Sequence, residues 1–141
     1  MASLTRLAAY RVRAFSLGEF VMIRLIPAPH RFPGNGRPPE LIEEFVGLAS
    51  SGTAEISVAR LVCPPGWTEP GQTPEFDEIT VVLKGALEVQ TKLGSHRVSA
   101  GEAIIVGRGE WVRYSTSTTE SAEYIAVCLP AFSPQAAHRD A

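Results

Sequence analysis

From residue 53 onward the chain consists of short apolar segments separated by turns. The first, TAEISVARLVC, alternates like an extended strand, with Ile56, Val58, Arg60 and Val62 on one side. Further segments follow, each bounded by Gly, Pro, Ser or Thr: EITVVLKG, ALEVQT, HRVS, EAIIVG, EWVRYST and AEYIAVCL. Many short strands at this spacing predict an all-β sandwich or barrel.

The first 52 residues follow a different pattern. EFVMIRLIPAP mixes β-branched and apolar residues and predicts a strand, and the Pro- and Gly-rich HRFPGNGRPP predicts a loop. Pro39 then precedes ELIEEFVGLAS, whose apolar spacing predicts a short amphipathic helix. We therefore expect one domain, in which an arm, loop and helix (1–52) pack on a barrel (53–132) that a tail (133–141) follows.

Composition narrows the possible partners. The chain has 141 residues, a net charge of −2 and 20% charged residues, as in an ordinary globular protein. Its cations are scattered, which argues against a nucleic-acid partner. No apolar run reaches the roughly 18 residues that a membrane helix needs, and no secretory signal is visible. We expect a cytoplasmic protein with no membrane partner.

The two cysteines, Cys63 and Cys128, both lie in apolar stretches. A free cysteine in such a stretch usually behaves as a small buried hydrophobic residue. We expect both to be free and buried, and a bridge between two strands is the alternative.

One spacing of glycines and polar residues is more specific. Gly66 is followed after five residues by Gln72, then by Pro74, by Glu78 after three more residues, and by Gly85 after six more. This frame resembles the first motif of the cupin superfamily, in which two histidines stand where this chain has Gln72 and Pro74.

A second spacing resembles the second cupin motif. Gly101 is followed after five residues by Gly107 and then by Gly109. Val112 and Thr116 stand where that motif has its histidine and asparagine. The resemblance covers the predicted barrel and implies a cupin double-stranded β-helix, a jelly-roll barrel.

The resemblance bears on cofactors. Cupins that hold a metal take their ligands from the motif histidines and Glu, and here only Gln72 and Glu78 retain an oxygen donor. Two oxygens are too few to hold a transition metal firmly. His30 is the best placed additional ligand, because its loop would fold over the barrel mouth. We expect no cofactor; a divalent metal on Glu78, Gln72 and His30 is the alternative.

The resemblance places Glu78 inside the barrel, where a carboxylate must be paired or have a raised pKa. Arg60 is a candidate partner, either as an inward cation or as an edge residue. Pointing inward, it would bind a carboxylate, phosphate or enolate while Glu78 acts as general acid or base. Glu69 and Glu75, also near the motif, are expected to face solvent.

Other residues would complete the pocket. Tyr114 shares a strand face with Val112, and it is either a donor to a substrate oxygen or a core tyrosine. Together with Glu78 and Arg60 it forms the expected catalytic set. The expected ligand-binding residues are Gln72, Trp67, Trp111, Thr80 and Val112.

We expect a small-molecule enzyme of isomerase, cyclase or lyase type that uses metal-independent acid–base chemistry. A dioxygenase is disfavoured, since oxygen activation needs a metal. The alternatives are a non-catalytic small-molecule binder or sensor and a cupin enzyme with an atypical metal site. The apolar outward positions Ile79, Val81 and Leu83 need cover, so we expect a homodimer, with residues 1–26 available for strand exchange.

Overall fold

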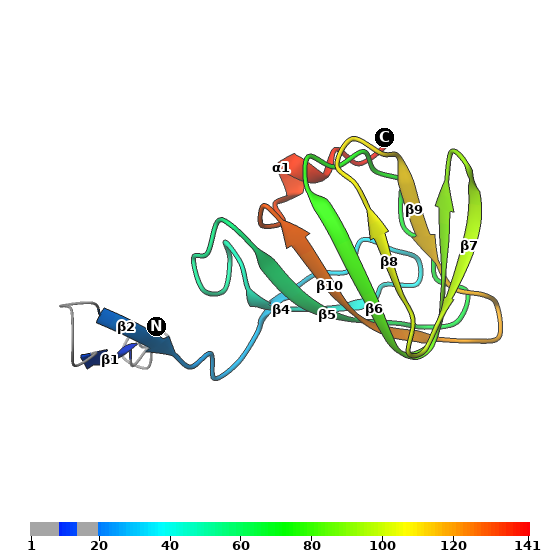
Figure 1. Ribbon diagram of the computed structural model, residues 1–141. Coiled ribbons are helices and arrows are strands. Elements are labelled where there is room, and N and C mark those ends of the chain that lie inside the picture. The colour runs from blue at the N-terminus through cyan, green and yellow to red at the C-terminus, as the bar shows by residue number, and fades with distance from the viewer. Residues whose placement is uncertain (1–8, 14–19) are drawn as a thin grey trace.

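The computed structural model describes residues 9–13 and 20–141, and nearly all of its regular elements are strands (Figure 1). The elements are β1 (Ala9–Arg13), β2 (Phe20–Arg24), β3 (His30–Phe32), β4 (Leu41–Val46), β5 (Ser57–Cys63), β6 (Asp77–Thr91), β7 (Gly94–Ser99), β8 (Ala103–Val106), β9 (Val112–Ser115), β10 (Ala122–Leu129) and α1 (Pro134–Ala137). The predicted all-β class is confirmed. No helix among these residues has the length and apolar character needed to cross a membrane.

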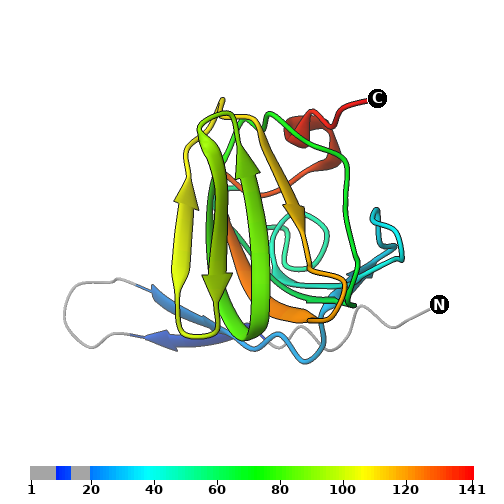
Figure 2. The ribbon, with the colours of Figure 1, turned by 90° about the vertical axis from the view of Figure 1, so that its right-hand side faces the viewer.

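The main sheet has the strand order β3-β4-β5-β10-β6-β7, and β8 and β9 also pair with β6. Strand β6 is 15 residues long. Its first half pairs with β10 and β8, and its second half pairs with β7 and β9. Strands β7 and β9 lie on the side of the barrel that faces the viewer in Figure 2.

Gly85 lies where β6 passes from one set of partners to the other. Its φ of 70° falls in the left-handed region, and a Cβ at this position would collide with the carbonyl oxygen of Ser121. Only glycine tolerates both conditions. The glycine at the end of the first motif therefore has a structural role at the middle of the barrel's longest strand.

The helix predicted from ELIEEFVGLAS is wrong, because most of this segment is strand β4. It pairs antiparallel with β5, with Ile42 opposite Leu61 and Glu44 opposite Ala59. Both residues of each pair line the interior of the barrel. The apolar residues are spaced as in a helix, but pairing with β5 overrides this local pattern and turns both Ile42 and Glu44 inward. The main sheet therefore begins upstream of residue 53.

The strand expected near the N-terminus is confirmed as β2, which pairs with β1 in a separate two-stranded sheet. Residues 1–8 and 14–19 lie outside the described part, so strand exchange by residues 1–26 stays a prediction.

The buried core lies inside the barrel. It includes Trp67, Leu87, Val89, Tyr114 and Tyr124. Both cysteines are free and buried, as predicted.

The outer face of β6 is apolar and partly exposed. Val81 and Leu83 are 37% and 48% exposed, and Ile105 of the adjacent β8 is 72% exposed. Ile105 lies directly opposite Ile79 in the sheet register. The outward orientation predicted for this face is correct, and the homodimer that would cover it stays a prediction.

Candidate functional site

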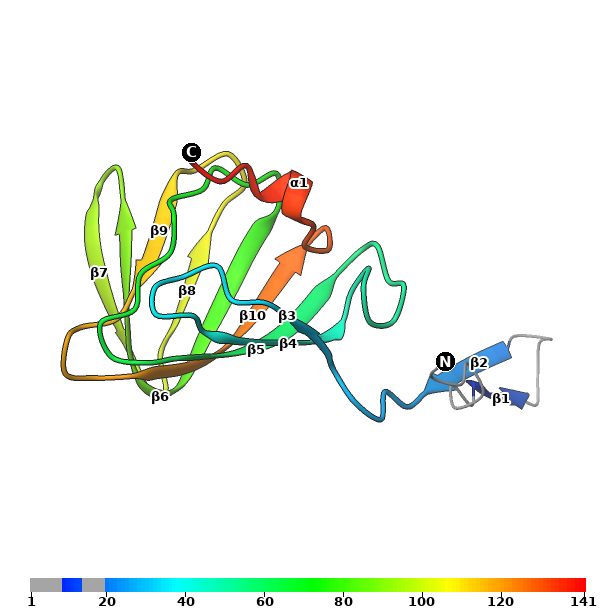
Figure 3. The ribbon, with the colours of Figure 1, turned by 180° about the vertical axis from the view of Figure 1, so that it is seen from behind.

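A cavity of about 220 Å³ opens inside the barrel. Its walls come from the inward residues of β4, β5 and β10, from the segment before β6, and from the residues around α1, which Figure 3 shows at one end of the barrel. The apolar part of the lining includes Phe32, Ile42, Leu61, Ala126 and Phe132. The polar part includes Glu44, Glu69, Gln72, Glu78, Tyr114, Tyr124 and Arg139.

Glu78 faces this cavity from the second position of β6, as the resemblance implied. It lies opposite Cys128 of β10, whose Sγ donates a hydrogen bond of 3.6 Å to Glu78 Oε1. Burial raises the pKa of Glu78, and the neighbouring Tyr114 hydroxyl, the Cys128 thiol and the charge of Arg139 oppose that rise. The carboxyl therefore retains its proton to higher pH than an exposed glutamate.

Glu69 is a second carboxyl in the same cavity, where the sequence indicated a solvent-facing side chain. Burial, with added repulsion from Glu78 and Glu40, raises its pKa to about 8, and Arg139 opposes this rise. Glu75 does lie on the surface, where it pairs with His138 at 3.1 Å. Two carboxyls with raised pKa values thus share one apolar space, an arrangement suited to acid–base work.

Tyr114 on β9 lines the cavity and is only 2% exposed. Its Oη makes no hydrogen bond of standard geometry to any residue that the structure describes. Burial, followed by the charge of Glu78, raises the pKa of Tyr114 well above its usual value, so the phenol keeps its proton. This hydroxyl is close enough to Glu78 to lower the pKa of that carboxyl, and it is a donor that a ligand in the cavity can also reach.

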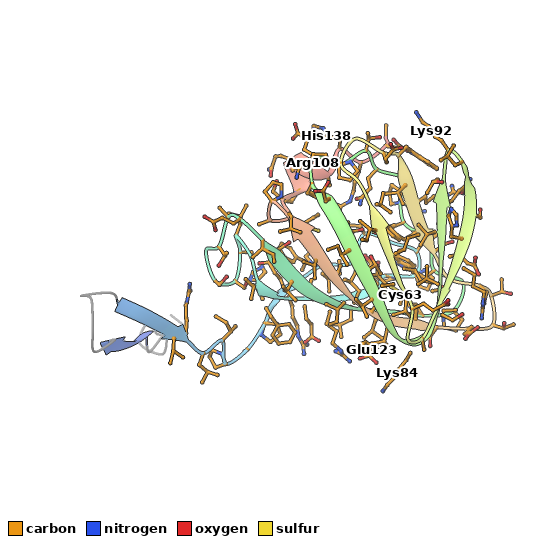
Figure 4. All side chains as sticks on the ribbon, in the orientation of Figure 1. Cys63, Lys84, Lys92, Arg108, Glu123 and His138 are labelled. Atoms are coloured by element: carbon orange, nitrogen blue, oxygen red, sulfur yellow. The ribbon has the colours of Figure 1, made fainter. Side chains whose placement is uncertain are left out.

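Arg60 does not enter the cavity, so its predicted role as an inward cation is wrong. Its neighbours on β5, Ala59 and Leu61, line the cavity, and strand alternation turns Arg60 outward. It forms ion pairs of 2.6 Å with Glu43 and with Glu123 on the outer face. Figure 4 shows Glu123 and Lys84 at the lower edge of the barrel, away from the interior.

The cation that lines the cavity is Arg139, which sequence reasoning missed. It comes from the segment after α1, which crosses the end of the barrel (Figure 3). That segment is held by a backbone bridge between Arg139 and Gln72 and by a 2.8 Å hydrogen bond from the Asp140 N–H to the Gly71 carbonyl. The Trp111 indole N–H donates to Asp140 Oδ2 at 2.9 Å.

Only Gln72 among the predicted ligand-binding residues lines the cavity. Trp67 is fully buried, and its indole N–H donates to Glu40 Oε2 at 2.7 Å. Trp111 holds the C-terminal segment instead of lining the pocket. Thr80 and Val112 are buried in the barrel wall and do not border the cavity.

The positions that the resemblance assigns to metal ligands do not make a metal site. Gln72 and Glu78 line the cavity, whereas the side chains of Pro74 and Val112 contain no donor atom. His30 is exposed and packs edge-on against Phe32, with 4.8 Å between the ring centroids. Across residues 9–13 and 20–141, no three His, Cys, Asp or Glu side chains group closely enough to hold an ion. This donor set does not fit a cupin metal.

The raised pKa of Glu69 predicts how stability depends on pH. The carboxyl binds its proton more tightly in the fold, with a pKa of about 8, than at its ordinary value of 4.5. Its contribution is therefore complete below pH 4.5 and is lost as the pH rises through about 8. We expect the free energy of unfolding to fall over this interval, with Glu69 contributing roughly 1–3 kcal/mol.

Urea unfolding at pH 5, 6.5 and 8 measures this fall. The Glu69→Gln variant should show a shallower fall than the wild type, and Glu55→Gln, at an exposed position, should not change it. If the free energy of unfolding falls equally with pH in the wild type and in Glu69→Gln, Glu69 is not protonated in the fold.

No family model matches the chain. A curated relative, endoribonuclease YbeY of Myxococcus xanthus (strain DK1622), is 48% identical over 99 residues, which make up 70% of this chain and 34% of that protein. The chain thus spans about a third of the length of this relative.

Several solved structures are similar in fold. A cupin-like protein of Thermotoga maritima gives a TM-score of 0.59 at 14% identity, covering 64% of this chain and 68% of that one. The polyketide cyclase RemF of Streptomyces resistomycificus gives a TM-score of 0.60 at 16% identity, covering 80% of this chain and 84% of that one. A putative ethanolamine utilization protein Q of Salmonella typhimurium gives a TM-score of 0.61 at 18% identity, covering 89% of this chain and 98% of that one. The chain has the cupin fold, and at these identities the likeness shows the fold alone.

Proposed function

We propose that this protein is a small-molecule enzyme of isomerase, cyclase or lyase type, which uses acid–base chemistry without a metal. The observation that carries the proposal is the pair of carboxyls, Glu78 and Glu69, facing one apolar cavity. Burial raises the pKa of both groups. A carboxyl whose pKa approaches the working pH can both accept and donate a proton.

The arrangement suits a reaction through an enol. Ionised Glu78 removes a proton from a carbon next to a carbonyl group, and the C–H electron pair moves to form the enolate. The Tyr114 hydroxyl, which lies beside Glu78 and makes no hydrogen bond of standard geometry to a described residue, donates a hydrogen bond to the enolate oxygen. Glu78 then returns the proton to the same carbon or to another one, so no atom or electron is gained or lost. Protonated Glu69 is the second acid available to the intermediate.

The fold is compatible with this class, since one protein that shares it is described as a polyketide cyclase. The curated relative is named as an endoribonuclease, and we do not propose RNA as the substrate here. RNA phosphates need clustered cations. Within the described lining, Arg139 is the only cation and it shares the cavity with carboxyls.

Deuterium exchange tests the proposal without knowledge of the natural substrate. The protein is incubated in D2O with phenylpyruvate and, separately, with phenylacetone, which carries a neutral methyl group in place of the carboxylate, and loss of the enolisable C–H signal is followed by NMR. We expect exchange faster than in buffer or with heat-denatured protein. Binding of both probes without faster exchange would contradict an enzyme and favour a non-catalytic binder.

A further inference from the structure

Arg139 brings a guanidinium to the cavity that no protein anion neutralises directly. No carboxylate of the described residues lies within ion-pair distance of it, although the charge of Arg139 affects the pKa of Glu69 and of Glu78. Its Nε is buried and has no hydrogen-bond partner among the described residues. The neighbouring carboxylate, Asp140, is engaged by Trp111. A buried donor without an acceptor costs free energy, unless a ligand supplies the acceptor.

The surroundings of Arg139 fix how its guanidinium lies. Its central carbon is 5.5 Å from the centroid of the Phe132 ring, within the distance of a cation–π contact. The backbone of Arg139 is bridged to Gln72, which also lines the cavity. The backbone is therefore held at Gln72 while the guanidinium lies over the Phe132 ring, and such pre-organisation favours binding of a planar anion.

The cavity also presents the buried Tyr114 hydroxyl, which lies beside Glu78 and makes no hydrogen bond of standard geometry to any described residue. Between these two donors the walls are apolar, with the rings of Phe32 and Phe132 among them. A ligand that satisfies both donors needs an anionic end, an apolar body and a second oxygen. The volume of about 220 Å³ restricts it to a small molecule.

We propose that the ligand is a small, ring-bearing monocarboxylate whose carboxylate binds Arg139 and whose second oxygen accepts a hydrogen bond from Tyr114. This inference rests on the proposed function and names its substrate class. A carboxylate matches the fork of a guanidinium in two parallel hydrogen bonds. A phosphate monoester fits less well, because one guanidinium offsets only one of its charges while Glu69 and Glu78 stand nearby.

Calorimetric titration with matched ligands tests the assignment. We expect the wild type to bind phenylpyruvate and benzoate more tightly than benzamide, the neutral analogue of benzoate, and more tightly than phenyl phosphate. Arg139→Met should weaken benzoate binding by about 10–100-fold, as expected for loss of a charge-assisted pair. It should leave benzamide binding within about threefold, which also shows that the cavity is intact.

Two further variants make the result specific. Arg139→Lys, which keeps the charge without the planar fork, should recover only part of the affinity for benzoate. Arg97→Met removes an exposed arginine that pairs with Glu120 and should change nothing. Equal losses for benzoate and benzamide, unchanged benzoate binding in Arg139→Met, or tighter binding of phenyl phosphate would each overturn the assignment.

Failure of this inference is distinguishable from failure of the proposed function. Phenylacetone is neutral and lacks a carboxylate, so its deuterium exchange in the wild type and in Arg139→Met reports acid–base chemistry alone. Exchange of phenylacetone without preferential binding of carboxylates would overturn the assignment of Arg139 and leave the enzyme proposal standing.

Discussion

Glu78→Gln is expected to slow deuterium exchange into phenylpyruvate by about 10²–10⁴-fold, the usual contribution of a positioned general base. Glutamine keeps the shape of the side chain but cannot take up the proton. Affinity for benzoate should remain close to that of the wild type, because the guanidinium proposed to bind it is Arg139. NMR exchange rates and calorimetry on the same preparation separate these two effects.

Matched variants show whether the loss belongs to Glu78 alone. Glu75→Gln, which alters an exposed carboxyl paired with His138, should exchange at the wild-type rate. If Glu69 only donates a proton to the enolate, the exchange rate of Glu69→Gln should lie between those of the wild type and of Glu78→Gln. Exchange at the full rate in Glu78→Gln would refute the role given to this residue, and Glu69 and Glu44, the other carboxyls of the described lining, would then be the candidate bases.

Glu40→Ala is expected to lower the free energy of unfolding by roughly 3–5 kcal/mol, because it leaves several buried donors without an acceptor. The Glu40 carboxylate, 5% exposed, accepts hydrogen bonds from the backbone N–H groups of Asn35 and Gly36, both at 2.8 Å. It also accepts one from the Trp67 indole at 2.7 Å. One side chain thus connects the loop before β4 to the largest buried residue of the core.

Denaturant unfolding measures this loss. Glu40→Gln retains one oxygen acceptor and should cost less than Glu40→Ala. Glu55→Ala, at an exposed position, should stay within about 0.5 kcal/mol of the wild type. A loss below about 1 kcal/mol in Glu40→Ala would mean that water replaces the carboxylate, and the loop would then be less tightly coupled to the core than the geometry indicates.

Strand alternation and turn residues were sufficient to predict most of the barrel. The inward position of Glu78 was implied by the resemblance to the cupin motif. The helix prediction failed because Leu41, Ile42, Phe45 and Val46 are spaced as in a helix, whereas the strand turns Ile42 and Glu44 to the same inward face. This strand is formed by pairing with β5, and pairing between distant segments is not encoded in a local pattern.

The charged groups of the site were harder to predict. Alternation in β5 correctly separated Arg60 from Ala59 and Leu61, but it does not say which face is inward. Arg139 and Glu69 lie outside the regular strands, so no period applies to them. The position of Arg139 depends on where the segment after α1 docks, and that docking rests on individual contacts such as Trp111 with Asp140.

Strand β6 has a consequence for the cooperativity of unfolding. Its two halves supply pairing partners to β7, β8, β9 and β10, so loss of β6 would leave the backbone groups of several strands without partners. The barrel therefore opens as one cooperative unit, and the slowest amide protons on either side of Gly85 exchange with solvent through the same global event. Most of these pairings join segments far apart in the sequence, which places the fold among the slow-folding topologies.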